Sequence, residues 1–206
     1  MTFFLEVIGT IAFAFAGALV AIDHDLDLFG IICMAVMTAC GGGMTRDVLL
    51  GNTPPMMFRN PIYVIIAVVV AFIVAAIYSS FNKYKFKKNI LDIVNILDAI
   101  GLAIFTIVGM DLALSLGYNH IFLVCSMGVV TAVGGGLIRD IMVNRKPVIL
   151  TKEVYAIASL IGSIIYFYGL QFTSQIIAST ISVIIIFGLR MWTIIKDINL
   201  PIVEKN

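Results

Sequence analysis

The chain has 206 residues, of which 61% are hydrophobic and 12% are charged, and its formal net charge is +1. Soluble domains are near half apolar and a quarter charged, and a chain this short cannot bury so much apolar surface in its own core. The composition therefore excludes an ordinary soluble enzyme, a disulfide scaffold and a disordered chain. The small net charge offers no basic face for nucleic acid.

Long apolar segments dominate the sequence. A helix needs about 20 apolar residues to cross a hydrocarbon core of ~30 Å, and long continuous runs favour helices over strands. We predict a single all-α integral membrane domain over residues 1–206, with short connections. Its seven expected membrane-spanning helices cover residues 3–22, 28–50, 61–80, 93–116, 120–143, 152–170 and 173–195.

Basic residues are distributed unequally between the two faces that these helices define. The face with the N-terminus and the loops after the second, fourth and sixth helices holds only Arg59. The positive-inside rule then predicts a protein of the cell inner (plasma) membrane with the N-terminus outside and the C-terminus in the cytoplasm. The lysines of segment 83–88 are interpreted as a topology anchor, with lipid headgroup binding as the alternative. The basic residues assigned to the cytoplasmic face are Lys83, Lys85, Lys87, Lys88, Arg145, Lys146, Lys152, Arg190, Lys196 and Lys205.

An internal repeat organises the chain. Segment 38–47 (TACGGGMTRD) recurs as segment 131–140 (TAVGGGLIRD), at an offset of 93. We predict two copies of a three-helix unit, residues 3–80 and 91–171, with the helix at 173–196 outside the repeat. Because three spans are an odd number, the second copy enters the membrane from the opposite side, an inverted repeat typical of transporters and of some channels. Further matched pairs, at an offset of 92 or 93, are Gly9 with Gly101, Gly17 with Gly109 and Pro54 with Pro147.

Three consecutive glycines stand inside the second and fifth predicted helices. Each costs roughly 1 kcal/mol relative to alanine in a helix interior, so we expect a break or a kink in both helices there. Broken backbone at membrane depth is tolerated where it lines a cavity, and freed carbonyls replace part of a cation's hydration shell. The alternative is that the glycines only permit a close helix crossing. The candidate residues of an ion pathway are Thr38, Gly41, Gly42, Gly43, Thr131, Gly134, Gly135 and Gly136.

Charged residues within the spanning segments form the second candidate set, because such charges are costly and usually face a cavity or a partner. Adjacent residues point to different faces of a helix, so each arginine is not expected to pair with the aspartate that follows it. Residues at matching depth predict two ion pairs instead, Glu6 with Arg46 and Asp98 with Arg139. We expect these pairs to act either as structural pins or as a gate or filter for ions in the pore. The set comprises Glu6, Arg46, Asp47, Asp98, Arg139 and Asp140.

The sequence shows no motif typical of catalysis or metal binding. The sequence contains no HExxH, GxSxG or GxxxxGK[ST] pattern, so we expect neither an enzyme nor a cofactor. Cys33, Cys40 and Cys125 have no metal-ligand spacing and are predicted to be small packing residues.

The duplicated GGGxxRD motif in a 3+3+1 arrangement of helices resembles the prokaryotic branch of the trimeric intracellular cation (TRIC) channel family, and the resemblance covers essentially the whole chain. Bacterial members of that family have also been labelled glycine-transporter-like domain proteins. The resemblance implies a homotrimer with one pore in each subunit, passing potassium and also sodium. It implies that the broken second and fifth helices line the pore, here at Gly41, Gly42 and Gly43 and at Gly134, Gly135 and Gly136.

Two functions remain open from the sequence. The first is a monovalent cation channel surrounded by membrane lipids. The second is a secondary transporter of a small zwitterion such as glycine, in which half-helix N-termini hold a carboxylate and freed carbonyls hold an ammonium group. For a trimer, the first and fourth or the second and fifth helices are candidate contacts, through the small residues Gly9, Gly17, Gly101 and Gly109.

Overall fold

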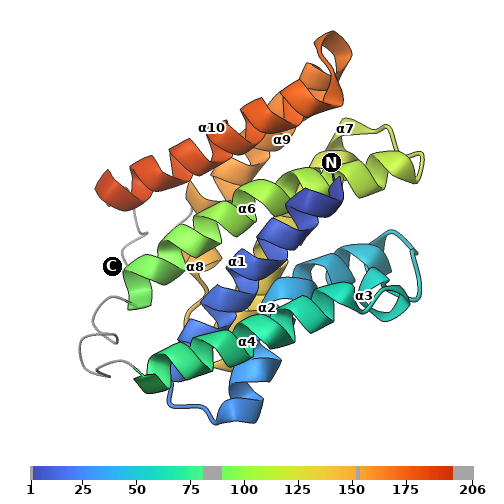
Figure 1. Ribbon diagram of the computed structural model, residues 1–206. Coiled ribbons are helices and arrows are strands. Elements are labelled where there is room, and N and C mark those ends of the chain that lie inside the picture. Colours follow the sequence, from blue (N-terminus) through green and yellow to red (C-terminus); the bar gives the residue numbers. More distant parts are fainter. Residues whose placement is uncertain (1, 81–89, 152–153, 197–206) are drawn as a thin grey trace, which may run out of the picture.

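The computed structural model is a bundle of helices and describes residues 2–80, 90–151 and 154–196, with the side chains of residues 2, 151 and 154 excepted (Figure 1). Within these ranges, seven helices are long and apolar enough to cross a membrane, as predicted. The chain is therefore a multi-pass membrane protein. The long helices are α1 (Thr2–Asp23), α2 (Leu28–Leu49), α4 (Ile62–Ser80), α6 (Ile90–Ser115), α7 (Ile121–Met142), α9 (Val154–Phe172) and α10 (Gln175–Lys196), and the short ones are α3 (Met56–Arg59) and α8 (Val148–Thr151).

The structure describes only some of the basic residues from which the topology was predicted. The lysines of segment 83–88, together with Lys152 and Lys205, lie outside the described residues. Arg190 was counted above among the basic residues of the cytoplasmic face. It lies inside α10 and is only 2% exposed. That assignment was wrong because the helix continues to Lys196 and turns this guanidinium toward neighbouring helices.

Four helices, α1, α2, α6 and α7, pack on one another in the centre of the bundle. In Figure 1, α1 and α6 run side by side through the middle, with α4 on one flank and α10 on the other. α4 packs on α1 and α2, whereas α9 and α10 pack on each other, α9 also on α7 and α10 on α6. The rings of Phe13 and Phe105 meet between α1 and α6 with centroids 5.2 Å apart.

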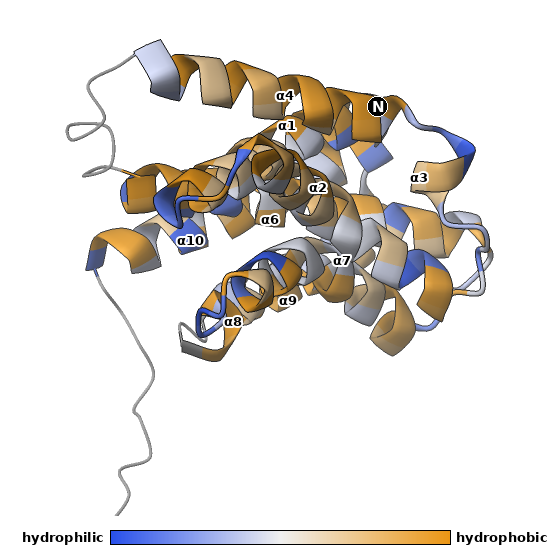
Figure 2. Ribbon diagram, turned by 90° about the horizontal axis from the view of Figure 1, so that it is seen from below, coloured by the Kyte–Doolittle hydropathy of each residue, from blue (hydrophilic) through white to orange (hydrophobic). Residues whose placement is uncertain are grey.

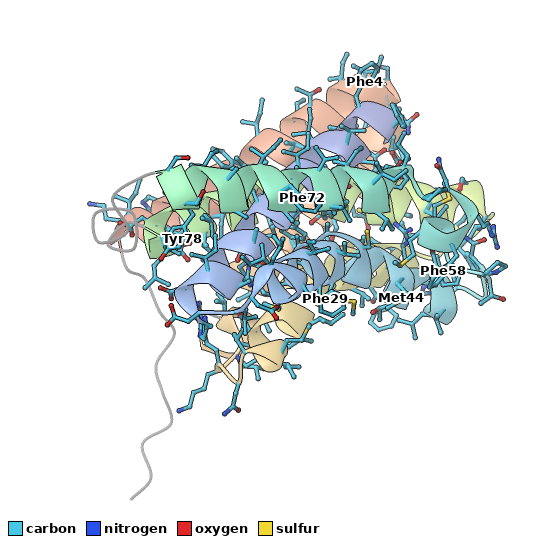
Figure 3. All side chains as sticks on the ribbon, turned by 60° about the horizontal axis from the view of Figure 1, so that its bottom comes forward. Phe4, Phe29, Met44, Phe58, Phe72 and Tyr78 are labelled. Atoms are coloured by element: carbon cyan, nitrogen blue, oxygen red, sulfur yellow. The ribbon has the colours of Figure 1, made fainter. Side chains whose placement is uncertain are left out.

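The outside of the bundle is apolar, as a hydrocarbon solvent requires. α4 has a mean hydropathy of 2.8 and is mostly orange in Figure 2. Figure 3 places Phe29 and Phe72 on the surfaces of α2 and α4, where they are 74% and 49% exposed. The core is mainly apolar as well, and the buried charged residues Arg46, Asp47, Asp98, Arg139, Asp140 and Arg190 lie within it.

The glycine triplets lie where α2 crosses α7, and neither helix breaks there. Both are assigned as helix through all three glycines, so the expected break is not found. A Cβ atom on Gly42 would overlap the carbonyl oxygen of Thr131, and one on Gly135 would overlap the carbonyl oxygen of Thr38. A Cβ on Gly134 would lie 2.9 Å from Gly42 Cα. An intact helix satisfies its own backbone hydrogen bonds without water, and the missing side chains are used for close backbone contact instead.

The four matched glycines of α1 and α6 serve the same purpose within the subunit. A Cβ on Gly17 would overlap the Thr38 hydroxyl, and one on Gly109 would overlap the Thr131 hydroxyl, both across a helix pair. Gly101 lies against Phe13, and Gly9 lies against Phe105. Their close contacts are therefore inside one chain, which removes the reason for proposing them as trimer contacts.

The ends of the central helices are built in matched pairs. After α2, Gly51 has φ +68° and its N–H donates to the Val48 carbonyl, while Asn144 after α7 has φ +53° and donates to the Ile141 carbonyl. The following residue in each case donates to the carbonyl of the motif aspartate, Asp47 or Asp140. This is a Schellman ending, which requires a left-handed residue at that position. Both helices therefore stop at the same place after the GGGxxRD motif.

The glycine crossing predicts a specific effect on stability. We expect Gly42→Ala and Gly135→Ala each to lower the free energy of unfolding by about 1–3 kcal/mol, because the added methyl group must displace backbone rather than a flexible side chain. Gly188→Ala in α10 is the control, because no atom lies within 4 Å of its added Cβ. The measurement is the thermal midpoint of the purified protein in detergent, and equal midpoints for the three variants would contradict the crossing.

Candidate functional site

One cavity opens beside the α2–α7 crossing, and we call it the Glu6 cavity. Its volume is about 50 Å³, room for a few water molecules. Residues of α1, α2, α3, α4, α6 and α7 surround it. They are Glu6, Thr10, Ala39, Cys40, Gly43, Met44, Arg46, Asp47, Met56, Met57, Tyr63, Phe105, Val108 and Thr131.

In each motif the arginine forms an ion pair with the aspartate that follows it, contrary to the sequence prediction. Arg46 Nη2 lies 2.8 Å from Asp47 Oδ1, and Arg139 Nε lies 3.1 Å from Asp140 Oδ1. The prediction considered only the directions of the two Cα–Cβ bonds. An arginine side chain is long enough to turn back along the helix surface, and burial of both groups favours the nearest opposite charge.

The second carboxylate oxygen of each motif aspartate binds the loop that follows its helix. Asp47 Oδ2 accepts a hydrogen bond from the N–H of Met56 at 2.8 Å, and Asp140 Oδ2 accepts one from the N–H of Val148 at 2.9 Å. Both aspartates are about 1% exposed. Each aspartate therefore neutralises its neighbouring arginine and also fixes the short helix α3 or α8 against the end of α2 or α7.

The predicted contact between Asp98 and Arg139 is present. Arg139 Nη1 donates to Asp98 Oδ1 at 2.7 Å and Arg139 Nη2 donates to Asp98 Oδ2 at 2.9 Å, a bidentate pair in which Arg139 is completely buried. Together with the bond to Asp140, the guanidinium has carboxylate partners on two sides. This arrangement combines charge with fixed geometry and is among the stronger polar contacts that proteins make.

The predicted pair between Glu6 and Arg46 is absent. Among the described residues no ion pair joins them, although both border the Glu6 cavity. Glu6 instead accepts a hydrogen bond from the Tyr63 hydroxyl of α4. The sequence argument missed Tyr63, whose phenol competes for the carboxylate, while Asp47 already neutralises Arg46.

The two halves of the chain thus place similar residues differently. Tyr155 occupies the position of Tyr63 at an offset of 92, but its buried hydroxyl has no hydrogen-bond partner among the described residues. The Arg190 guanidinium of α10 lies over the Tyr155 ring, 4.9 Å from its centroid. Nε and Nη2 of Arg190 likewise lack a partner in the described part of the chain. We call Asp98, Arg139, Asp140, Tyr155 and Arg190 the Asp98 cluster.

The candidate ion-pathway residues are only partly gathered around the cavity. Of that set, Gly43 and Thr131 line it, whereas Gly42 and Gly135 are occupied by the helix crossing. The hydroxyls of Thr38 and Thr131 each donate to a carbonyl of their own helix at 2.6 Å, which leaves their lone pairs as acceptors. The roles of Gly41, Gly134 and Gly136 in an ion pathway stay predictions.

A separate polar group lies away from the Glu6 cavity. Asp111 of α6 accepts hydrogen bonds from the hydroxyl of Tyr166 in α9 and from Gln175 Nε2 at the start of α10. These residues do not line the cavity, and Asp111 has no acidic counterpart at an offset of 92, where Leu19 stands. Like Glu6, Asp111 is a carboxylate that accepts a hydrogen bond from a tyrosine hydroxyl, but it lies outside the Glu6 cavity.

Comparison with known proteins finds one family over most of the chain. A family model described as "Glycine transporter" matches residues 3–79 and again 95–171. The UPF0126 inner membrane protein YadS of Escherichia coli (strain K12) is 35% identical over 166 residues, covering 81% of this chain and 77% of YadS. The UPF0126 membrane protein YvgT of Bacillus subtilis (strain 168) is 36% identical over 165 residues, covering 80% of this chain and 79% of YvgT.

Solved structures of TRIC channels match the fold along almost its whole length. A TRIC cation channel studied for its conductance has a TM-score of 0.84 and 35% identity, and covers 98% of this chain and 97% of its own. A prokaryotic TRIC channel crystallised in 0.5 M KCl has a TM-score of 0.86 and 33% identity, with coverages of 97% and 98%. A TRIC orthologue from Rhodobacter sphaeroides has a TM-score of 0.85 and 30% identity, with coverages of 96% and 98%.

Asp98 pairs with a buried arginine and Glu6 does not, so we predict that removing the two carboxylates lowers stability by unequal amounts. We expect Asp98→Ala to cost about 3–5 kcal/mol of stability, because it leaves the buried Arg139 with only part of its counter-charge. Glu6→Ala is the matched control and should cost less, because Arg46 retains Asp47. Thermal midpoints in detergent measure both effects. A Glu6→Ala variant that is as unstable as Asp98→Ala would contradict the assignment of partners.

Proposed function

The chain belongs to the prokaryotic TRIC channel family, and from this membership and the charges of the Glu6 cavity we propose that it is a monovalent cation channel, passing potassium and also sodium. The observation that carries the proposal is a charge difference between two polar sites. The charged residues lining the Glu6 cavity are Glu6, Arg46 and Asp47, and their formal charges sum to −1. Because Arg46 and Asp47 neutralise each other, the cavity presents one half-buried carboxylate to an entering cation.

The Asp98 cluster is the opposite case. Two carboxylates, Asp98 and Asp140, face two guanidinium groups, Arg139 and Arg190, so that the formal charge is zero. A cluster with a formal charge of zero has no excess negative charge to attract a cation. We propose that the ion pathway enters at the Glu6 cavity, passes the α2–α7 crossing near Gly43 and Thr131, and is closed at the Asp98 cluster. The sequence left two roles open for the Asp98–Arg139 pair, a structural pin or a gate. In this proposal the pair acts as the gate.

Topology and assembly complete the proposal. The repeat offset and the positive-inside rule support an inverted arrangement in the inner membrane, with the N-terminus and the Glu6 cavity outside and the Asp98 cluster toward the cytoplasm. The relative in Escherichia coli is described as an inner membrane protein, in agreement with this location. A homotrimer with one pore in each subunit follows the name of the Rhodobacter sphaeroides orthologue, which is described as a trimeric intracellular cation channel. The apolar outside of each subunit is then divided between lipid and neighbouring subunits.

The second candidate function is secondary transport of a zwitterion such as glycine. Two observations favour it: the description of the matching family model, and the presence of both a carboxylate, Glu6, and a guanidinium, Arg46, around one cavity. An ammonium group would pair with the first and a carboxylate with the second. The unbroken helices do not form the half-helix termini that would hold such a substrate at the glycines, and they do not free the backbone carbonyls expected there for a cation either.

Current through the purified protein in a planar bilayer separates the two functions. With a potassium gradient across the bilayer, a channel gives discrete steps that reverse near the potassium potential. A silent bilayer together with saturable counterflow of labelled glycine in liposomes would overturn the channel proposal and establish transport.

The Glu6 carboxylate is the residue on which the proposed cation preference depends. We expect Glu6→Gln to lower the single-channel potassium conductance several-fold, because the amide keeps the Tyr63 hydrogen bond and removes the negative charge. Asp111→Asn is the matched control, since it removes a carboxylate that does not line the cavity. Equal conductance in the wild type and the Glu6→Gln protein would show that ions do not pass this carboxylate.

A further inference from the structure

Four sulfur-containing residues line the Glu6 cavity. Cys40 and Met44 of α2 border it from one side, and Met56 and Met57 of α3 border it from another. Cys40 is 8% exposed and Met44 is half-buried, so both lie at the boundary between the core and the cavity. One thiol, three thioethers and the carboxylates of Glu6 and Asp47 therefore belong to the residues around a space that holds only a few water molecules.

The backbone fixes where these sulfur-bearing residues lie. Cys40 and Met44 are four residues apart on α2 and so project from the same face of the helix. Met56 is held by its own N–H, which donates to Asp47 Oδ2 at 2.8 Å. Figure 3 shows Met44 at the same end of the molecule as Phe58, the next residue of α3 after Met57. The motif aspartate thus brings α3 and its methionines to the cavity mouth formed by α2.

The sequence repeat provides an internal comparison for these four positions. Methionine often fills irregular gaps in cores, so sulfur alone does not indicate a ligand. At the same offset of 93 that relates the GGGxxRD motifs, however, the second half of the chain has no sulfur at any of the four positions. The residues corresponding to Cys40, Met44, Met56 and Met57 are Val133, Leu137, Ile149 and Leu150. Branched aliphatic side chains therefore meet the packing needs of the motif, and at these four positions only the half with the Glu6 cavity has sulfur.

We propose that the Glu6 cavity is a binding site for a soft monovalent metal cation, Cu(I) or Ag(I). Thiolate and thioether ligands select Cu(I) over the hard cations that carboxylates and carbonyls prefer. On binding, the Cys40 thiol forms a bond to the metal and releases its proton to water, while the methionine thioethers coordinate without a change of charge. The Glu6 carboxylate supplies negative charge near the bound cation. In the described part of the chain no group of three or more His, Cys, Asp or Glu residues is placed to hold a metal, so the proposed site takes its further ligands from the thioethers.

A variant that copies the second half of the chain tests the site. The repeat-matched variant is Cys40→Val, Met44→Leu, Met56→Ile and Met57→Leu, which keeps volume close to that of the native side chains. The control is Cys125→Val, Met110→Leu and Met127→Leu, which removes a thiol and two thioethers from a hydrophobic cluster away from the cavity. Cys33 is retained in both variants.

Silver(I) is the probe, because it shares the ligand preference of Cu(I) and needs no reductant. In equilibrium dialysis against silver nitrate without chloride, the wild type and the control should each bind one more ion per subunit than the repeat-matched variant. Equal binding by the wild type and the repeat-matched variant overturns the site. If the repeat-matched variant does not give monodisperse protein, Cys40→Val and Met44→Leu are measured singly, each with an expected loss of affinity of at least tenfold. Unchanged affinity in both also overturns the site.

Potassium current distinguishes this proposal from that of the channel. Silver(I) should block the current of the wild type and the control, and leave the repeat-matched variant conducting. Cavity-dependent silver binding without block supports the metal site and contradicts the placing of the ion pathway through the cavity. Block of all three proteins alike shows that silver blocks elsewhere, and together with equal binding it overturns the site while the channel proposal stands.

Discussion

The backbone contact between α2 and α7 is the constraint from which the rest of the arrangement follows. Gly42 meets the Thr131 carbonyl and Gly135 meets the Thr38 carbonyl, so that the two helices touch without side chains between them. No other residue type permits this approach, because any Cβ would overlap main-chain atoms that cannot move independently. The crossing separates the two polar sites. The Glu6 cavity borders it at Gly43 and Thr131, and the Asp98 cluster is anchored by the end of α7, just beyond Gly136.

The motif that follows the glycines is a compact solution to burying charge in an apolar environment. A lone arginine at membrane depth is costly, and the adjacent aspartate neutralises it without help from another helix. The same aspartate uses its second oxygen to hold the next short helix, α3 or α8. Because the motif satisfies its own charges, any additional charge nearby remains available for another task. In the first half this extra charge is Glu6, and in the second half it is Asp98.

The sequence was informative where the physical signal is long and repeated, and misleading where it depends on competition between partners. Seven spans followed from apolar length, and the Asp98–Arg139 contact followed from charge and depth. The break expected at the glycines is not found, because helix propensity measured in water ignores the close contact that glycine permits inside a bundle. The predicted Glu6–Arg46 pair was wrong, because the sequence does not reveal that Glu6 binds Tyr63 and that Arg46 binds Asp47. Their partners depend on α4 and on side-chain length, neither of which is a local pattern.

The helix outside the repeat explains why the two halves are not alike. Tyr63 and Tyr155 hold corresponding positions, yet only Tyr63 donates its hydroxyl to the nearby acid. α10 has no partner in the first half, and it places Arg190 over the Tyr155 ring. A buried cation on an aromatic face is stabilised by the ring and requires no bond to the hydroxyl, so Tyr155 is engaged through its face rather than its oxygen. Asp98 is then left to Arg139 alone and forms the bidentate pair, whereas Glu6 remains free of arginine and keeps its charge facing a cavity. A repeat that alone would give two equivalent sites thus becomes one charged site and one neutral site, and the proposed cation pathway rests on that difference.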